Sequence, residues 1–178
     1  ESMITVLGRE GQALVTAGEV RGLGPNEQIQ AVRFLADKAY VVTFRQTDPL
    51  FVVDLADPTR PRLAGELKIP GFSSYLHPVD DGHLVGVGTD GDEQGNTFGT
   101  VVSLFDVTNP ASPARTAKLS IGPEGDGGNG FGNDGSWTPV SSDARAFTWW
   151  ENKAVVPVSW YRFDPRTGEL VCFGYSVF

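Results

Sequence analysis

An internal repeat constrains this chain more than any other feature of its sequence. The segment from Phe51 to Gly71, FVVDLADPTRPRLAGELKIPG, returns in altered form from Ser103 to Gly122 as SLFDVTNPASPARTAKLSIG. Identical residues keep one spacing in both copies, since residue 106 lies 52 positions after residue 54. The matched pairs are Asp54 and Asp106, Pro58 and Pro110, Pro61 and Pro113, Leu67 and Leu119, and Ile69 and Ile121. A repeat of this length, made only of strand-like segments, predicts a solenoid or a propeller.

Strand-like runs recur along the whole chain, separated by clusters of Gly, Pro, Asp and Asn, and no window has the apolar spacing of a helix. The expected strands cover residues 3–7, 13–20, 29–35, 39–44, 50–55, 62–69, 73–78, 83–88, 99–107, 114–121, 145–150, 153–158, 159–164 and 170–177. Grouped in fours, they predict an all-β, partial β-propeller of about three four-stranded antiparallel blades, over about 29–70, 73–122 and 137–178. Residues 1–21 are expected to be the tail of a preceding blade.

A turn with two prolines ends the third strand of the first two blades. The strand stops at Asp54 in one copy and at Asp106 in the other, and the turns DPTRP and NPASP follow. Proline fixes φ and lacks an N–H group, so these turns interrupt the sheet pairing. The third copy, residues 163–170, departs from this pattern with a shorter turn that holds one proline.

The charge balance narrows the classes of partner. Among 178 residues, 22 are Asp or Glu and 14 are Lys or Arg, which gives a formal net charge of −8. Such a surface repels phosphate backbones and anionic membranes, so we expect no nucleic-acid partner. No apolar run approaches the roughly 20 residues of a membrane helix. The single cysteine, Cys172, allows no internal disulfide and is interpreted as a small buried apolar residue.

Three stretches carry a family resemblance: residues 32–95 (VRFLADKAYVVTFRQTDPLFVVDLADPTRPRLAGELKIPGFSSYLHPVDDGHLVGVGTDGDEQG), TVVSLFDVTNPASP and SDARAFTWWENKAVVPV. Together they resemble the secreted C-terminal β-propeller domains of bacteria and archaea, distant relatives of WD-repeat propellers. The resemblance implies a propeller fold and an extracytoplasmic, secreted protein. No signal peptide is present at Glu1, so we expect one to have been removed or to lie outside this sequence. Where similar proteins carry Asp-His-Lys/Arg-Ala-Phe, this chain has Asp143-Ala144-Arg145-Ala146-Phe147 and lacks that histidine.

The length of the chain does not fit a closed ring. With about 52 residues per blade, 178 residues make about three and a half blades, whereas closed propellers have about four to eight. An open arc leaves sheet edges free and invites self-association. We therefore expect a fragment of a larger propeller. The alternatives are an atypical small barrel and a dimer that completes the ring.

The acidic loop over residues 89–96, TDGDEQGN, is the sharpest candidate for chemistry. Asp90, Asp92 and Gln94 with a following Gly are spaced like the start of a calcium loop, which uses hard oxygen ligands around a tight turn. The position for a bidentate Glu is Val101, so the loop is not an EF-hand. It is either a simpler calcium site or a polar hairpin between the second and third strands of a blade.

A glycine-rich stretch, GPEGDGGNGFGNDG over residues 122–135, offers three more acids, Glu124, Asp126 and Asp134. They would join a metal site or close over a ligand if the stretch folds back on the blades. The alternative is a simple connector between blades.

Two histidines flank the turn at residues 78–82. The set Ser73 or Ser74, His77 and Asp80 contains the residue types of nucleophilic catalysis. These residues crowd one strand, where neighbours point to opposite faces, and no nucleophile elbow is present. We interpret His77 as a structural hydrogen-bonding group, and the spacing of His77 and His83 does not suit zinc. No glycine-rich phosphate loop opens a helix, so a nucleotide site is not supported.

Aromatic residues gather in the last third of the chain. Trp137, Trp149 and Trp160 form a candidate binding surface for sugar rings or a partner's anchors, and packing between blades is the alternative. Adjacent Trp149 and Trp150 must face opposite ways on a strand, so only one of them faces the core.

These observations favour a non-catalytic, extracytoplasmic module that binds a protein or ligand within a larger secreted protein. That inference is an analogy from fold. The rival is a calcium-dependent propeller hydrolase or lyase that uses Asp90, Asp92 and Asp126. A third option is a structural domain that presents another region of the protein.

Overall fold

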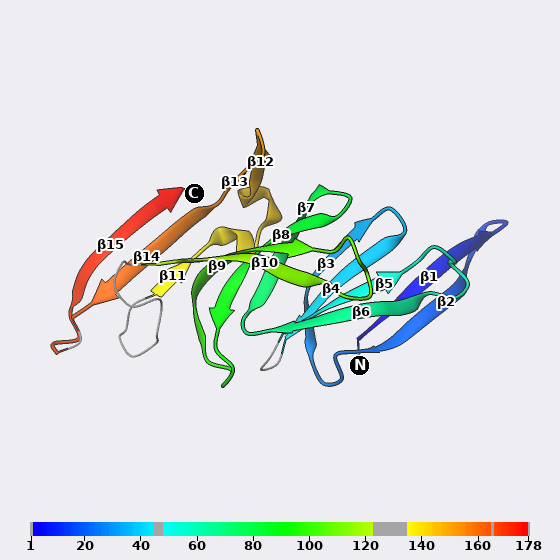
Figure 1. The fold of residues 1–178 in the computed structure, drawn as a ribbon, viewed down its shortest axis with the longest axis horizontal. Coiled ribbons are helices and arrows are strands. Elements are labelled where there is room, and N and C mark those ends of the chain that lie inside the picture. The colour runs from blue at the N-terminus through cyan, green and yellow to red at the C-terminus, as the bar shows by residue number, and fades with distance from the viewer. Residues whose placement is uncertain (1, 45–47, 123–134, 165, 178) are drawn as a thin grey trace.

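The computed structural model describes residues 2–44, 48–122, 135–164 and 166–177 (Figure 1). Its strands pair in antiparallel fashion, and its two largest sheets are four-stranded meanders in the middle of the molecule. The first sheet contains β3 (Gln28–Leu35), β4 (Lys38–Phe44), β5 (Asp48–Asp54) and β6 (Arg62–Ile69) in that order. The second contains β7 (Phe72–Asp80), β8 (His83–Gly91), β9 (Thr97–Asp106) and β10 (Ala114–Ile121). Chain order equals spatial order in both sheets.

Smaller units flank these sheets. On the N-terminal side, β1 (Ser2–Glu10) pairs with β2 (Ala13–Leu23). On the C-terminal side, β11 (Gly135–Trp137), β14 (Pro157–Phe163) and β15 (Leu170–Val177) form a three-stranded sheet in the order β11-β14-β15. A separate hairpin joins β12 (Thr148–Trp150) to β13 (Lys153–Val155), after the 3-10 turns η1 (Pro139–Ser141) and η2 (Ala144–Ala146).

The C-terminal unit therefore differs from the four-stranded blade expected there. The predicted strand at 145–150 starts as a 3-10 turn, because the Asp143 side chain accepts the Arg145 N–H at 3.0 Å and caps η2. The predicted strands at 153–158 and 159–164 divide instead into β13 and β14, with β13 belonging to the hairpin.

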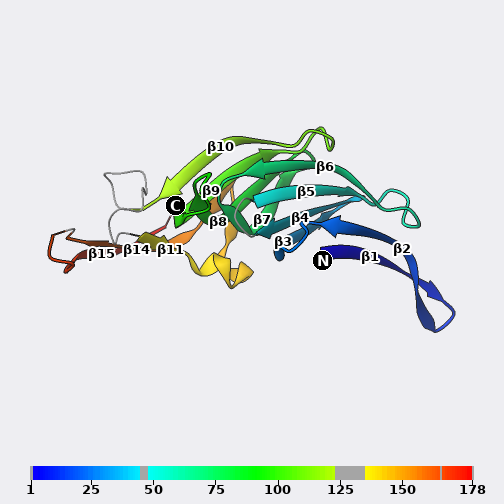
Figure 2. The same cartoon turned by 90° about the horizontal axis from the view of Figure 1, so that it is seen from below.

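The units stack in chain order along the long axis of the molecule (Figures 1 and 2). Three apolar layers hold them together, and Val87 and Val156 belong to the one between the second sheet and the C-terminal unit. Leu23 and Val41 belong to the layer between β1–β2 and the first sheet. Tyr40 and Phe105, both 1% exposed, belong to the layer between the two four-stranded sheets. The predicted all-β, partial propeller is thus confirmed, and no sheet in the described parts of the chain closes into a ring.

One irregularity recurs in every outer pair of strands. In β2, Ala17 bulges out of the register between Thr16 and Gly18. The same bulge occurs at Ala64 in β6 and at Thr116 in β10. A bulge increases local twist and is a defined structural feature. The β1–β2 pair therefore corresponds in structure to the third and fourth strands of a blade.

Glycine allows the outer strands β2 and β6 to touch the next layer. A Cβ added to Gly18 of β2 would lie 2.6 Å from the Pro58 carbonyl oxygen. A Cβ added to Gly65 of β6 would lie 2.9 Å from the Ala111 carbonyl carbon and closer still to the Pro110 carbonyl oxygen. The proline turn of one sheet thus packs directly on the outer-strand backbone of the preceding layer, at two successive joints.

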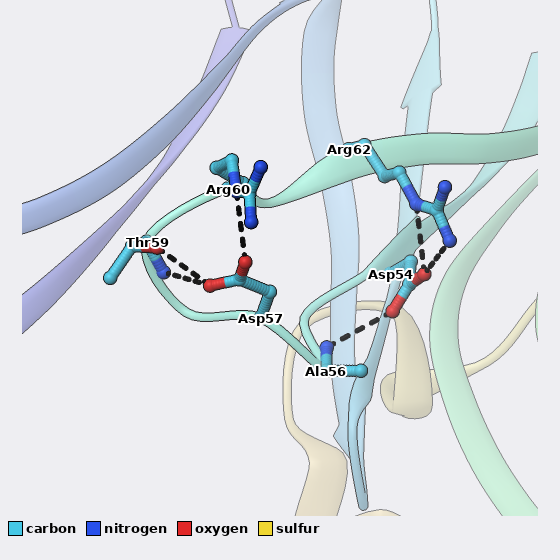
Figure 3. A network of polar contacts seen from close by, with 6 residues as sticks. All are labelled: Asp54, Ala56, Asp57, Thr59, Arg60 and Arg62. Carbon is cyan, nitrogen blue, oxygen red and sulfur yellow. Dashed lines mark hydrogen bonds and ion pairs between the residues drawn. The ribbon is translucent and has the colours of Figure 1, made fainter.

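Carboxylates organise these proline turns (Figure 3). Asp54 accepts the Ala56 N–H at 3.0 Å and contacts the Arg62 guanidinium at 2.8 and 3.0 Å. Asp57 accepts the Thr59 N–H at 3.0 Å and its hydroxyl at 2.7 Å. Such side-chain-to-backbone bonds mimic a backbone turn and explain why Asp recurs at these positions.

The other copies repeat this bonding. Asp106 accepts the Thr108 N–H at 2.9 Å and its hydroxyl at 2.6 Å, and Asn109 accepts the N–H two residues later at 3.2 Å. In the third copy, Asp164 accepts the Arg166 N–H at 2.7 Å. The shorter third turn thus keeps the first bond of the motif.

Candidate functional sites

The acidic loop links three strands of the second sheet. Asp90, near the end of β8, is 4% exposed. Its Oδ1 lies 2.6 Å from the Lys118 ammonium and accepts the Gly91 N–H at 2.8 Å. Its Oδ2 accepts the Ser120 hydroxyl at 2.6 Å. A buried carboxylate is tolerated when it is paired and hydrogen-bonded, and both conditions are met by side chains from β10.

Asp92 serves the turn between β8 and β9. Its carboxylate accepts the backbone N–H groups of Gln94 at 3.0 Å and Asn96 at 2.9 Å, and the Asn96 side-chain amide at 2.8 Å. The hydrogen bond from the Asn96 side chain lowers the pKa of Asp92 below 3.8. Gln94 contributes its backbone to this turn, and its side chain is exposed.

The two carboxylates thus bind different partners. Within the described residues no group of three His, Cys, Asp or Glu side chains is placed to hold a metal ion. Glu124, Asp126 and Asp134 lie outside the described residues. These contacts leave the calcium expectation for Asp90, Asp92 and Gln94 untested.

The sequence analysis did not identify Lys118 and Ser120 as partners of Asp90, although the repeat contained a signal of their role. The first copy has Glu66 and Lys68 at the corresponding positions of its outer strand. The charge therefore reverses between Glu66 and Lys118. A reversal of charge at an otherwise matched position indicates that the side chain has a different partner in the second copy. For Lys118 that partner is the buried Asp90.

His77 lies in an aromatic cluster where β7 meets the C-terminal unit. Its ring centroid is 5.5 Å from that of Trp149, in a stacked arrangement, and 4.8 Å from that of Phe147. The Tyr75 hydroxyl lies 3.3 Å from Nδ1 of His77. Burial, followed by the charge of Arg33, lowers the pKa of His77 below 6.5, so the ring is neutral at neutral pH and packs as an aromatic group.

The predicted set of Ser73 or Ser74, His77 and Asp80 is divided among other contacts. Asp80 accepts the Gly82 N–H at 2.7 Å and lies 2.9 Å from Nδ1 of His83. Ser73 is 4% exposed and packs beneath the backbone of β8. The role of His77 is therefore packing between two layers, together with the hydrogen bond to Tyr75.

The motif at 143–147 takes part in the same contact between layers. Asp143 caps η2 and pairs with Arg145 at 2.9 Å, while Phe147 is 8% exposed and belongs to the cluster. Ala144, where similar proteins are expected to have histidine, starts η2 and is exposed.

The four tryptophans lie in different surroundings. Trp149 faces His77, whereas Trp150 is 58% exposed on the opposite side of the hairpin, as strand alternation requires. Trp137 is 55% exposed at the end of β11. Trp160 pairs with Ser136 in the register and therefore points to the other face of its sheet, where it covers Gly174. Trp137, Trp149 and Trp160 thus do not share one surface, and their part in binding stays a prediction.

The structure does not describe the side chain of one further predicted residue, Cys172. Cys172 is part of β15, but its side chain lies outside the described part of the chain, and its expected burial stays a prediction.

Stacked antiparallel meanders, joined in chain order with recurrent outer-strand bulges and proline turns, define a sector of a β-propeller. Residues 1–176 match the family model of the β-propeller domain. The chain belongs to the β-propeller domain family.

Two curated relatives are uncharacterised archaeal proteins. A protein of Methanocaldococcus jannaschii is 38% identical over 136 residues, which cover 76% of this chain and 19% of that protein. A protein of Archaeoglobus fulgidus is 50% identical over 102 residues, which cover 57% of this chain and 16% of that protein. The chain therefore spans less than a fifth of the length of these relatives. Among the described residues, no helix has the length and apolar character needed to span a membrane.

Proposed function

We propose that the chain is one sector of a larger extracytoplasmic β-propeller that binds a protein or ligand and performs no chemistry of its own. The observation that carries this proposal is the β12–β13 hairpin. It forms a two-stranded sheet apart from the stacked layers and projects from them (Figure 1). Its outward tryptophan, Trp150, is 58% exposed.

The hairpin presents Trp150 in a fixed orientation. The turn residues Glu151 and Asn152 have φ values of 45° and 60°, the left-handed geometry of a tight two-residue hairpin. Trp149 anchors the inner face of the hairpin against His77. The Lys153 ammonium lies 5.4 Å from the Trp150 ring centroid. A rigid, exposed aromatic ring loses little entropy on binding and is a common anchor in interfaces.

The polar side chains that could act in catalysis are held in structural contacts, which supports a binding role over a catalytic one. The Asp90 carboxylate is neutralised by Lys118, and Asp92 holds its own turn. His77 packs between aromatic rings. Each group would have to leave a structural contact before it could act on a substrate.

Binding can be tested with two probe sets, a glycan array and a phage-displayed peptide library. We expect Trp150→Ala to remove most binding to any glycan or peptide selected by the intact chain, about tenfold or more as for an aromatic hot spot. Leu14→Ala is the matched control, because Leu14 is 71% exposed on β2, in the N-terminal unit. Equal loss of binding in both variants, or no loss in either, contradicts the proposal. Cleavage of any polysaccharide in a test panel by the chain favours the alternative, a hydrolase or lyase.

The extracytoplasmic location rests on the family resemblance. Fractionation of cells that express the full-length protein, followed by immunoblotting, tests it. Protein recovered from the cytoplasm alone contradicts it.

A further inference from the structure

The β12–β13 hairpin is held against the second sheet by side chains from one of its faces. Its two strands pair with each other, and no other strand in the described parts of the chain joins their sheet. Trp149 and Ala154 lie opposite each other and form the inner face, which packs on the apolar layer beside the second sheet. Trp150 and Lys153 are the next pair and form the outer face. The orientation of Trp150 therefore depends on how firmly the inner face is packed.

His77 lies under this inner face. The ring centroids of His77 and Trp149 are 5.5 Å apart, with an angle of 29° between the ring planes. The Phe147 ring, which directly precedes β12, lies 4.8 Å from that of His77. The described members of the adjoining apolar layer are hydrophobic, with Tyr75 among them. In this contact His77 is therefore the side chain whose charge changes between about pH 5 and pH 8.

The strands beside His77 place no negative charge against its ring within the described residues. The Tyr75 hydroxyl lies 3.3 Å from Nδ1, and β8 places Val85 opposite His77 in the register. Arg33, on β3, is the charged residue that acts on the ring, and its positive charge opposes a second one. Burial first, and Arg33 second, therefore lower the pKa of His77.

The charged residues around the hairpin pair with one another instead of with His77. Before β12, Asp143 and Arg145 form an exposed pair at 2.9 Å. At the hairpin turn, Glu151 and Lys153 form an exposed pair at 3.7 Å. A proton on His77 thus stays uncompensated while the hairpin is packed on the ring, whereas release of the hairpin opens the ring to water.

We propose that His77 makes the packing of the β12–β13 hairpin depend on pH, so that protonation of His77 releases the inner face and with it the fixed orientation of Trp150. This inference rests on the proposed function, because it makes binding through Trp150 strong at neutral pH and weak in acid. The packed hairpin disfavours the charged ring, so a falling pH shifts the population toward the released hairpin. A return to neutral pH restores the packing, since no covalent bond changes.

Hydrogen–deuterium exchange of the ligand-free chain is the first test, read as protection factors that correct for the pH dependence of intrinsic exchange. We expect the protection of residues 148–155 to be at least about threefold lower at pH 5.0 than at pH 7.5. His77→Phe keeps an aromatic ring under Trp149 and carries no charge, so this variant should keep the protection at pH 5.0. Residues 38–44 in the first sheet are the internal control. Equal loss in both regions, or equal loss in the parent chain and His77→Phe, overturns the proposal.

A proton NMR titration of the His77 ring tests the same coupling from the other side. Because linkage is reciprocal, Trp149→Ala should raise the titration midpoint of His77 toward 6.5. Trp150→Ala is the matched control on the outer face of the same strand and should leave the midpoint unchanged. Equal midpoints in the parent chain and Trp149→Ala overturn the proposal.

Both measurements are made without ligand, so they decide the pH dependence of the hairpin separately from the proposed function. The proposed function is decided by the loss of binding in Trp150→Ala. For a glycan or peptide selected on the glycan array or from the phage-displayed library, we expect the affinity of the parent chain to fall at least about threefold from pH 7.5 to pH 5.0. The affinity of His77→Phe should change less, and an equal fall in both overturns the proposal.

Discussion

At the scale of single residues, buried polar groups decide what the loops can do. Asp90 is held by an ammonium and a hydroxyl from β10, and His77 by two aromatic rings of the C-terminal unit. Sequence reasoning singled out both residues, but it found neither set of partners. The partners of Asp90 lie about thirty positions away in the chain, and only the fold brings them close.

The first prediction concerns the Asp90–Lys118 pair. The side chain of Asp90 is 6% exposed, and Lys118→Met removes the cation that pairs with it. The variant should therefore lose about 1–3 kcal/mol of unfolding free energy. Asp90→Asn should recover part of that loss in the Lys118→Met background. Urea unfolding measures both. Lys68→Met is the control, because its ion pair with Glu66 is exposed, and a loss as large as that of Lys118→Met would contradict the assignment.

A second prediction concerns calcium. Binding at Asp90 has to displace Lys118, so we expect thermal melts in excess calcium and in chelator to coincide. A filled site at a hundred times its dissociation constant would add about 2.7 kcal/mol and raise the melting temperature by roughly 5–10 °C. A rise of that size, lost in Asp90→Asn, Asp92→Asn, would establish the metal site.

His77 predicts a pH dependence near neutrality. Because its pKa in the folded protein lies below 6.5, the unfolded chain binds the proton more readily. The stability that neutral His77 adds to the folded protein is fully present above pH 6.5. It is lost as the pH falls from 6.5 toward the lower pKa of His77 in the folded protein. Melting temperatures at pH 7.5 and 5.5 should differ less in His77→Phe than in the parent chain. Leu14→Ala, which removes an exposed side chain that does not titrate, should keep the parental difference; if His77→Phe keeps it too, the prediction fails.

At the scale of elements, the repeat predicted the two complete sheets well. The alternating runs after residue 28 and the Asp-led proline turns correspond to strands and turns of both sheets. The C-terminal unit was harder, because the Asp143 cap and Thr138 cap favour short 3-10 turns over a strand. The kinship of β2 with β6 was visible as Ala17-Gly18-Glu19-Val20 against Ala64-Gly65-Glu66-Leu67, but its meaning required the shared bulge.

The joint between layers yields a prediction at this scale. Gly65→Ala forces a Cβ into the Pro110–Ala111 backbone and should cost about 1–3 kcal/mol of unfolding free energy. Gly8→Ala is the matched control in another strand, because its Cβ would meet its nearest neighbour at an ordinary 3.6 Å. Denaturant unfolding compares the two variants. Equal stability would mean that the turn does not press on β6.

At the scale of the whole molecule, the turns share one electrostatic property. Hydrogen bonds lower the pKa of the turn carboxylates below 3.8. The largest cause is a backbone N–H for Asp54 and Asp80. For Asp57 and Asp106 it is a threonine hydroxyl. A lowered folded pKa adds stability that is present above pH 3.8 and lost as the pH falls through the folded pKa. Unfolding midpoints in urea should therefore drop between pH 5 and pH 2.5. Asp54→Asn, Asp106→Asn should flatten that slope, and an unchanged slope would contradict it.

The joint made by an outer-strand glycine and a proline turn also bears on how such a chain grows. The first two layers present the same surface to their successors, since Gly18 and Gly65 meet successive turns in the same way, whereas β10 has Ala117 at the corresponding position. A duplication of 52 codons therefore brings its own joint with it and needs no new contact. The number of layers is then set by gene history and by whatever finally seals the two ends, and a protein of this kind can lengthen its arc without redesigning any single layer.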